Sequence, residues 1–167
     1  TKGWTPNVAR RNEQRLQQID FDAIEGVPAF VTLTMPSQQM SDVSAAMFHG
    51  WLKRWLQYMK RHGMCHYYWI LEFQATGNPH LHLLVWLNHD WDALEQYHAL
   101  SSWVNMLNKS GVGARIQGQA WENIDVGGMI TVDGESVPAH PERVLMYLAK
   151  HAARGVAHYQ RQLSNMP

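Results

Sequence analysis

The sequence feature that most constrains the fold is a pair of strand-like segments separated by a short turn. Residues 65–74 and 79–87 are rich in aromatic and aliphatic residues, and Ala75-Thr-Gly-Asn78 between them has the composition of a turn. Segments joined this closely pair as an antiparallel hairpin, because a parallel pair needs a crossover of about a dozen residues or more. The chain is therefore predicted to contain an antiparallel sheet.

The second segment of this hairpin carries two histidines on one face. His80 and His82 alternate with Leu81 and Leu83, and residues two apart on a strand project to the same side. Neutral imidazole nitrogens are good ligands for first-row divalent ions. The pair therefore predicts half of a metal site; the alternative is two partly exposed strand histidines.

The first segment carries Glu72, the one carboxylate of the sequence between Asp42 and Asp90. If the hairpin is centred on Thr76, Glu72 lies directly across from His80, and a shift by one residue would turn it to the other face. A carboxylate in so apolar a strand is costly to bury, and a bound cation removes that cost. We therefore expect Glu72 and the two histidines to bind a divalent metal with coordination positions left open for substrate.

The remaining segments predict further helices and strands in a regular order. Thr5-Pro6 begins a polar helix that runs to about Gln18, and residues 30–35 form a strand with Thr32 and Thr34 on one face. The later predicted elements are a helix from Ser41 to about residue 62, a helix from Asp90 or Asp92 to about residue 108, a strand near residues 114–121, a hairpin or ordered loop within residues 123–139, a helix from Pro141 to about residue 154, and a short helix within residues 156–163.

This order is β-α-β-β-α-β followed by a C-terminal helix. It predicts an α+β fold, with an antiparallel sheet of about five strands and helices packed on one face. The alternation of Thr32 and Thr34 predicts that the other face stays open. The length of 167 residues fits one domain, so we expect residues 1–167 to form a single domain with residues 1–27 as an N-terminal helical extension.

Composition narrows the class of protein. With 46% hydrophobic residues the chain is not disordered, and no apolar run approaches the ~20 residues that cross a bilayer, so no membrane association is expected. The single cysteine, Cys65, cannot form an internal disulfide, which favours the cytoplasm. Residues 1–63 have 8 basic and 5 acidic side chains, residues 64–142 have 2 and 9, and residues 143–167 have 4 and none. Basic ends around an acidic middle permit nucleic-acid binding despite zero net charge.

The predicted helix from Pro141 carries a tyrosine on its polar side. Arg143, Tyr147, Lys150 and Arg154 follow one another at steps of four, three and four residues, so they share one face. Nearby cations or a metal favour the phenolate of a tyrosine and also hold phosphate oxygens. The alternative is an amphipathic surface helix with a half-buried tyrosine.

Taken in order, three motifs resemble the HUH endonuclease superfamily, specifically the nicking domains of rolling-circle replication initiators from plasmids and filamentous phages. The segment Phe30-Val-Thr-Leu-Thr-Met-Pro36 is similar to the family's first-strand motif. His80-Leu-His82 matches its His-hydrophobic-His motif, and Tyr147-Leu-Ala-Lys150 matches its Tyr-x-x-Lys motif. The resemblance covers roughly residues 28–163.

The resemblance implies an activity and a role for each matching residue. His80 and His82 would hold Mg²⁺ or Mn²⁺, with Glu72 as the third ligand. Tyr147 would attack the phosphorus of single-stranded origin DNA, giving a 5′-phosphotyrosine and a free 3′-OH that primes replication, and the reverse attack would religate the strand. Lys150 would contact the phosphate or tune Tyr147.

The same resemblance implies how DNA is bound and which partners are needed. The strand would be held by two threonines of the first strand and two arginines of the tyrosine helix, Thr32, Thr34, Arg143 and Arg154. Tyr159, the next tyrosine, lies past Gly155, so the resemblance implies a one-tyrosine enzyme. The sequence has no Gly-x-x-x-x-Gly-Lys-Ser/Thr motif. A helicase would therefore be a separate host protein or a missing part of the chain.

Three other functions remain open from the sequence. A single-tyrosine HUH transposase has the same histidine and tyrosine motifs. A zinc hydrolase or structural zinc protein would use His80 and His82, although Leu83-Leu-Val85 adds no further ligand nearby. A non-catalytic nucleic-acid-binding sheet of the RNA-recognition type would leave Tyr147 without a role.

Overall fold

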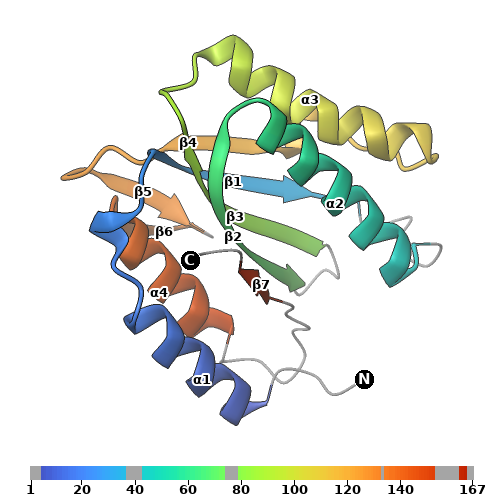
Figure 1. Ribbon diagram of the computed structural model, residues 1–167. Helices are drawn as coiled ribbons and strands as arrows, with labels where there is room; N and C mark the ends of the chain where they lie inside the picture. Colours follow the sequence, from blue (N-terminus) through green and yellow to red (C-terminus); the bar gives the residue numbers. More distant parts are fainter. Residues whose placement is uncertain (1–4, 37–42, 74–78, 133, 153–161, 165–167) are drawn as a thin grey trace.

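A five-stranded antiparallel sheet forms the centre of the computed structural model, which describes residues 5–36, 43–73, 79–132, 134–152 and 162–164 (Figure 1). Its strands are β1 (Val27–Thr34), β2 (Met64–Phe73), β3 (Pro79–Leu87), β4 (Ala120–Asn123) and β7 (Gln162–Ser164). They lie in the order β4-β1-β3-β2-β7. A separate two-stranded sheet pairs β5 (Met129–Val132) with β6 (Glu135–Pro138).

Each long helix begins at a residue that caps its free backbone N–H groups. The helices are α1 (Pro6–Gln17), α2 (Ala45–Arg61), α3 (Ala93–Lys109) and α4 (Pro141–Ala152). The side chains of Thr5 and Ser44 accept hydrogen bonds from the first turns of α1 and α2. Asp92 and Glu95 form a reciprocal capping box at the start of α3. These local signals fix where the helices start along the chain.

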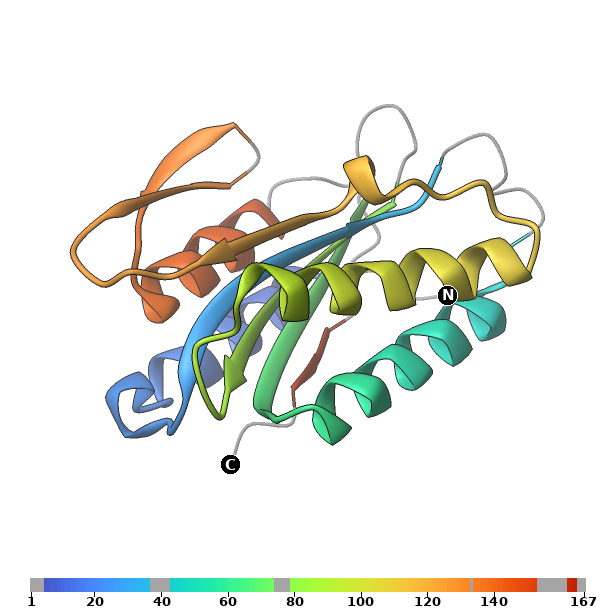
Figure 2. The ribbon, with the colours of Figure 1, turned by 90° about the horizontal axis from the view of Figure 1, so that it is seen from above.

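The helices form two layers, one on each face of the sheet (Figure 2). One apolar cluster joins α2 and α3 to the face that carries Val31, Leu83 and Trp69. A second cluster joins α1 and α4 to the opposite face, through residues such as Leu84 and Ile70. Because successive residues of a strand point to opposite faces, the central strands β1, β2 and β3 supply both clusters.

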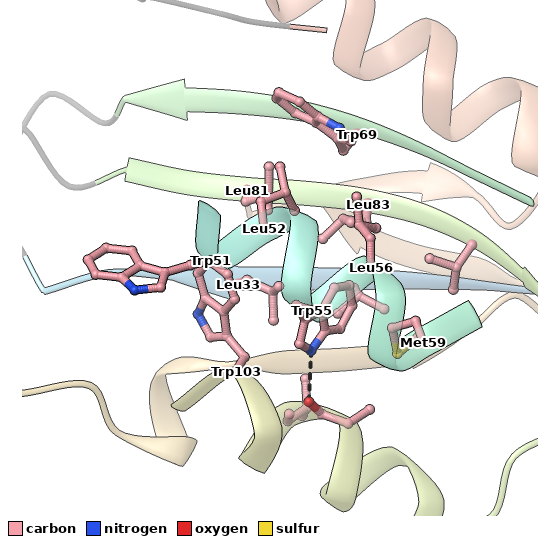
Figure 3. Packing of buried hydrophobic residues seen from close by; sticks show 14 of the residues in the cluster. Leu33, Trp51, Leu52, Trp55, Leu56, Met59, Trp69, Leu81, Leu83 and Trp103 are labelled. Carbon is pink, nitrogen blue, oxygen red and sulfur yellow. Dashed lines mark hydrogen bonds between the residues drawn. The ribbon is translucent and has the colours of Figure 1, made fainter. Parts of the chain in front are cut away.

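The layer of α2 and α3 is built around large aromatic side chains (Figure 3). Trp55 on α2 is fully buried, and its indole N–H donates to the carbonyl oxygen of Ala99 on α3 at 2.9 Å. Trp103 and Trp51 are buried in the same cluster. Trp55 therefore holds the two helices together as well as packing against the sheet.

The structure confirms the α+β class, the β-α-β-β-α-β order and the sheet of about five strands. The expectation of an open second face is wrong for much of that face, because α1 and α4 bury their apolar sides on it. The sequence pattern of Thr32 and Thr34 describes only one end of the face. The residues predicted as an N-terminal extension contribute α1 to this layer.

Three element boundaries also differ from the predictions. The cap of α2 is Ser44, whereas Ser41 lies outside the described residues. The strand predicted near residues 114–121 begins only at Ala120, because residues 116–118 form a 3-10 turn. Residues 162–164 form a strand against β2 rather than part of a helix, because β2 offers an edge for backbone pairing; residues 153–161 lie outside the described part.

Among the described residues, none of the helices combines the length and the apolar character that crossing a membrane requires.

We predict that Trp55→Ala lowers the free energy of unfolding by about 3–5 kcal/mol, because it removes a fully buried aromatic side chain. Trp55→Phe keeps most of the apolar contact and loses the hydrogen bond to Ala99, so a smaller loss of about 1 kcal/mol is expected. Urea denaturation measures both values. Lys109→Ala, an exposed change on α3, is the control; a Trp55→Ala protein as stable as this control would contradict the prediction.

Candidate functional site

The pairing of β1, β2 and β3 gathers the predicted site residues on one face of the sheet. β2 and β3 pair with Glu72 opposite His80, which is the register that the sequence predicted. β1 and β3 pair with Thr32 opposite His82 and Thr34 opposite His80. Directly opposite residues of an antiparallel pair share a face. We call the sheet face that carries these five residues the site face.

His82 is the most fixed of these side chains. It is 2% exposed, and its ring stacks on Phe30 with the ring centroids 5.6 Å apart. Its Nδ1 atom lies 3.1 Å from the hydroxyl oxygen of Thr32, and its Nε2 atom lies 3.5 Å from Oε2 of Glu72. The imidazole is therefore held by a neighbour on each side, with Nε2 directed toward the carboxylate.

The site becomes more accessible from His82 toward the end of the strands. His80 is partly exposed, and its ring centroid lies 6.0 Å from that of His82. The side chain of Glu72 is 18% exposed. A small ligand could therefore reach His80 and Glu72 from solvent while His82 forms the buried side of the site.

The donor atoms of the site fit a divalent cation. Two imidazoles and one carboxylate suit first-row divalent ions. A histidine that binds a metal through one ring nitrogen usually donates its other N–H to a nearby acceptor, and the Thr32 hydroxyl is in place to accept from Nδ1 of His82. That tautomer leaves the Nε2 lone pair facing Glu72. Within the described residues, no three His, Cys, Asp or Glu side chains already form a metal-binding cluster.

The tyrosine helix, α4, packs on the site face. Val144, Leu145 and Leu148 are buried in the same apolar cluster as Ile70, the residue of β2 that lies opposite His82. Tyr147 packs against this cluster and is partly exposed, although its hydroxyl oxygen is covered. The sheet face that carries the histidines therefore also receives the helix that carries the predicted nucleophile.

The other predicted residues of this helix are placed less fully. Arg143 is exposed on α4, one turn before Tyr147. Lys150 lies on α4 one turn after Tyr147, and its side chain is outside the described part of the structure. Arg154 lies outside the described residues. Thr32 and Thr34 are both partly exposed on the site face.

Two further residues support the site, and the sequence did not single out either. The Gln119 side chain accepts from the backbone N–H of Thr34 at 2.7 Å and donates to its carbonyl oxygen at 3.1 Å. These are the hydrogen bonds that a neighbouring strand would make, so Gln119 fixes the strand opposite His80. Asn12 of α1 accepts from the hydroxyl of Tyr68 at 3.1 Å and ties α1 to β2. Burial raises the pKa of Tyr68, so its hydroxyl remains a donor at neutral pH.

Comparison with known proteins assigns this arrangement to a family. A family model described as replication-associated protein ORF2/gene 2 protein matches residues 28–154. The chain belongs to this family of replication-associated proteins. The matched residues include the strands of the site face and the whole of α4.

The relatives are replication proteins of bacteria and phages by name. A candidate replication protein of Xylella fastidiosa (strain Temecula1) is 31% identical over 169 residues, which cover 99% of this chain and 55% of the relative. The replication-associated protein of Pseudomonas phage Pf3 is 27% identical over 168 residues, which cover 99% of this chain and 52% of the relative. This replication-associated chain thus spans about half the length of these curated relatives. No solved structure is significantly similar to it.

Glu122 is an acidic residue of this replication-associated chain that the sequence did not assign to the site face. β4 pairs with β1 so that Glu122 lies opposite Phe30, the residue that stacks on His82. Its Oε2 atom is buried and has no hydrogen-bond partner in the described parts of the chain, and burial raises the pKa of the carboxyl. The predicted strand ended at residue 121, which left Glu122 in a loop.

We predict that Glu122→Gln raises the thermal unfolding temperature at pH 7 but not at about pH 4. A carboxyl whose pKa is raised on folding favours the folded state below its unfolded pKa of about 4.3, and that contribution is lost as the pH rises through the folded pKa. The amide cannot ionise, so it avoids this loss. Glu135→Gln, at an exposed position, is the control. An equal effect at both pH values would contradict the role of ionisation.

Proposed function

We propose that this replication-associated chain is an HUH-type endonuclease that nicks and rejoins single-stranded DNA at a replication origin, and so initiates rolling-circle replication. The observation that carries the proposal is the common placement of Glu72, His80 and His82 on the sheet face against which the Tyr147 helix packs. The family match to replication-associated proteins supports the DNA substrate. The residues described above would act together as one nicking unit.

The proposed metal site consists of His80, His82 and Glu72. When bound there, Mg²⁺ or Mn²⁺ would polarise the scissile phosphate and neutralise charge in the transition state. The protein's own contribution is orientation: Thr32 and Phe30 fix the ring of His82, and β2 holds Glu72 beside it. Preorganised ligands need little movement when the substrate arrives.

Tyr147 is the proposed nucleophile. Its oxygen would form a bond to phosphorus as the bond from phosphorus to the 3′ oxygen of the preceding nucleotide breaks, so the phenol loses its proton and the departing 3′ oxygen gains one. The product is a 5′-phosphotyrosine and a free 3′-OH. Attack by a 3′-OH reverses the step and needs no ATP, because the energy of the phosphodiester bond is kept in the adduct.

The covered hydroxyl oxygen of Tyr147 adds a condition to this mechanism. An oxygen shielded from solvent cannot reach a phosphate without movement, so the side chain must rotate when the strand binds. The partly exposed ring lies at the surface of the apolar cluster, where such a rotation displaces little of the core. The free protein would therefore keep its nucleophile protected until DNA is present.

The proposed DNA-binding groups surround this centre. Thr32 and Thr34 would contact the strand on the site face, and Arg143, Lys150 and Arg154 would contact its phosphates from the tyrosine helix. Such a combination of cations with an exposed sheet surface suits single-stranded DNA. We propose that the protein works in the cytoplasm of a bacterial host and that a separate helicase unwinds the duplex.

The other candidate functions are less well supported. A single-tyrosine transposase would use the same motifs, but the family match is to replication-associated proteins. A zinc protein or a non-catalytic DNA-binding sheet gives no reason for a tyrosine helix on the face of the histidine pair. Nicking of a fixed origin separates replication initiation from excision of a mobile element.

We predict that Tyr147→Phe abolishes the covalent protein–DNA adduct, because the ring remains and the attacking oxygen is lost. The protein is incubated with an origin oligonucleotide and Mn²⁺, and the adduct is detected on a denaturing gel. Tyr97→Phe, at an exposed position on α3, is the matched control and should form the adduct normally. Cleavage at the same phosphate by the Tyr147→Phe protein would refute the assignment.

We also predict that Thr32→Val weakens Mn²⁺ binding by about 10- to 100-fold, because the hydroxyl that orients His82 is lost. Isothermal titration calorimetry measures the affinity directly. Thr131→Val, at an exposed position on β5, is the control. His82→Ala should abolish cleavage and retain much of the DNA binding; equal loss of both activities would instead indicate a role in folding.

A further inference from the structure

A cavity of about 380 Å³ lies between α2 and β2, in the helix layer opposite the site face. Its apolar part is formed by Leu52 and Leu56 of α2 with Tyr67 and Trp69 of β2. Its volume falls in the range of small-molecule sites, which is about 300–1,000 Å³. The nicking mechanism proposed above uses none of these residues.

The rim of the cavity is cationic. Lys53 and Lys60 line it from α2, together with His49 and Gln57. The two lysines are seven residues apart, which places them two turns and about 10 Å apart along one side of the helix. Residues 45–61 carry four basic side chains and no acidic one, and no acidic side chain is among the lining residues in the described chain. The occupant that fits this rim is an anion.

The floor of the cavity favours an aromatic ligand with a hydrogen-bond acceptor. The Lys60 ammonium lies 5.3 Å from the ring centre of Tyr67, so the rim cation and the floor are in contact. Trp69 is 1% exposed, and its indole N–H has no hydrogen-bond partner in the described part of the chain. A buried N–H without an acceptor is costly, and a base carbonyl is one group that could satisfy it.

We propose that this cavity binds a nucleotide of single-stranded DNA, with phosphates at Lys53 and Lys60 and the base over Tyr67 and Trp69. The inference rests on the proposed function for the identity of the polymer. Because α2 lies on the face opposite the histidine pair, the nucleotide bound here belongs to a different segment from the one that is cut. The cavity would thus hold the strand away from the nick.

The first test measures the salt dependence of DNA binding without cleavage. A fluorescein-labelled oligothymidylate is titrated with the protein in EDTA, and fluorescence anisotropy gives the affinity between about 50 and 200 mM salt. Each phosphate contact on a single strand contributes about 0.7 to the salt slope, so Lys53→Ala/Lys60→Ala should lower the slope by about 1.4. Wild-type affinity should then fall about sevenfold more than that of the variant over this range. A double variant with the wild-type slope would overturn the proposal.

Matched variants separate the lysines and the cavity from general charge effects. Lys109→Ala/Arg115→Ala removes two exposed cations elsewhere and should leave affinity and slope nearly unchanged. Gln57→Trp places a large ring on an exposed rim position and should weaken binding without changing the slope, because both lysines remain. A control pair that matched the lysine pair in its effect, or a Gln57→Trp protein that bound as wild type, would contradict the assignment.

Photocrosslinking locates the base and identifies the ligand. An oligonucleotide with 5-iodouracil should crosslink to the peptide that contains Tyr67 and Trp69, and Gln57→Trp should remove this adduct. Crosslinks confined to the site face would overturn the proposal. Thymidine monophosphate and polyglutamate should compete poorly; equal competition by the free nucleotide would contradict binding of a strand, and equal competition by polyglutamate would contradict recognition of a nucleotide.

These assays also separate this inference from the proposed function. Binding in EDTA needs neither Tyr147 nor a metal, so lysine-dependent binding without any covalent adduct would refute the nicking activity alone. Normal adduct formation by Lys53→Ala/Lys60→Ala on a short origin oligonucleotide, together with an unchanged salt slope, would refute the cavity alone.

Discussion

The register between β2 and β3 is the constraint on which the candidate site depends. It places Glu72 opposite His80 and directs both toward the face on which α4 packs. A shift by one residue would turn Glu72 into the α2–α3 layer and leave a carboxylate among buried tryptophans. The apolar residues that alternate with the histidines, such as Leu81 and Leu83, oppose this shift because they are buried in that layer. The packing of the core thereby selects the geometry of the site.

The two helix layers have different tasks. α2 and α3 bury a tryptophan-rich face and stabilise the sheet, whereas α1 and α4 cover only part of the opposite face. The uncovered end keeps His80 and Glu72 partly exposed beside the buried His82. This gradient of burial suits a site in which one ligand is held rigidly and others meet substrate. It also accounts for the position of Tyr147 at the edge of the apolar cluster.

Local patterns predicted most of the fold, and long-range contacts account for what they missed. The alternation around His80 and the turn before it predicted the hairpin and its register, because strand periodicity and turn length are properties of adjacent residues. The role of Gln119 could not be predicted, since its side chain replaces a strand that lies far away in sequence. The packing of α1 beside α4 likewise depends on one buried residue, Leu16, in an otherwise polar helix. Glu122 was missed because the boundary of β4 was placed too early.

The most direct test of the central claim is to locate a bound divalent ion relative to Tyr147. Nuclear magnetic resonance of the labelled protein with trace Mn²⁺ reports this distance, because the ion broadens signals from nearby nuclei. The account predicts strong broadening for His80, His82 and the Tyr147 ring, while the indole N–H of Trp55 in the opposite layer stays sharp. Broadening centred on the α2–α3 layer, or histidine signals that Mn²⁺ leaves unchanged, would contradict it.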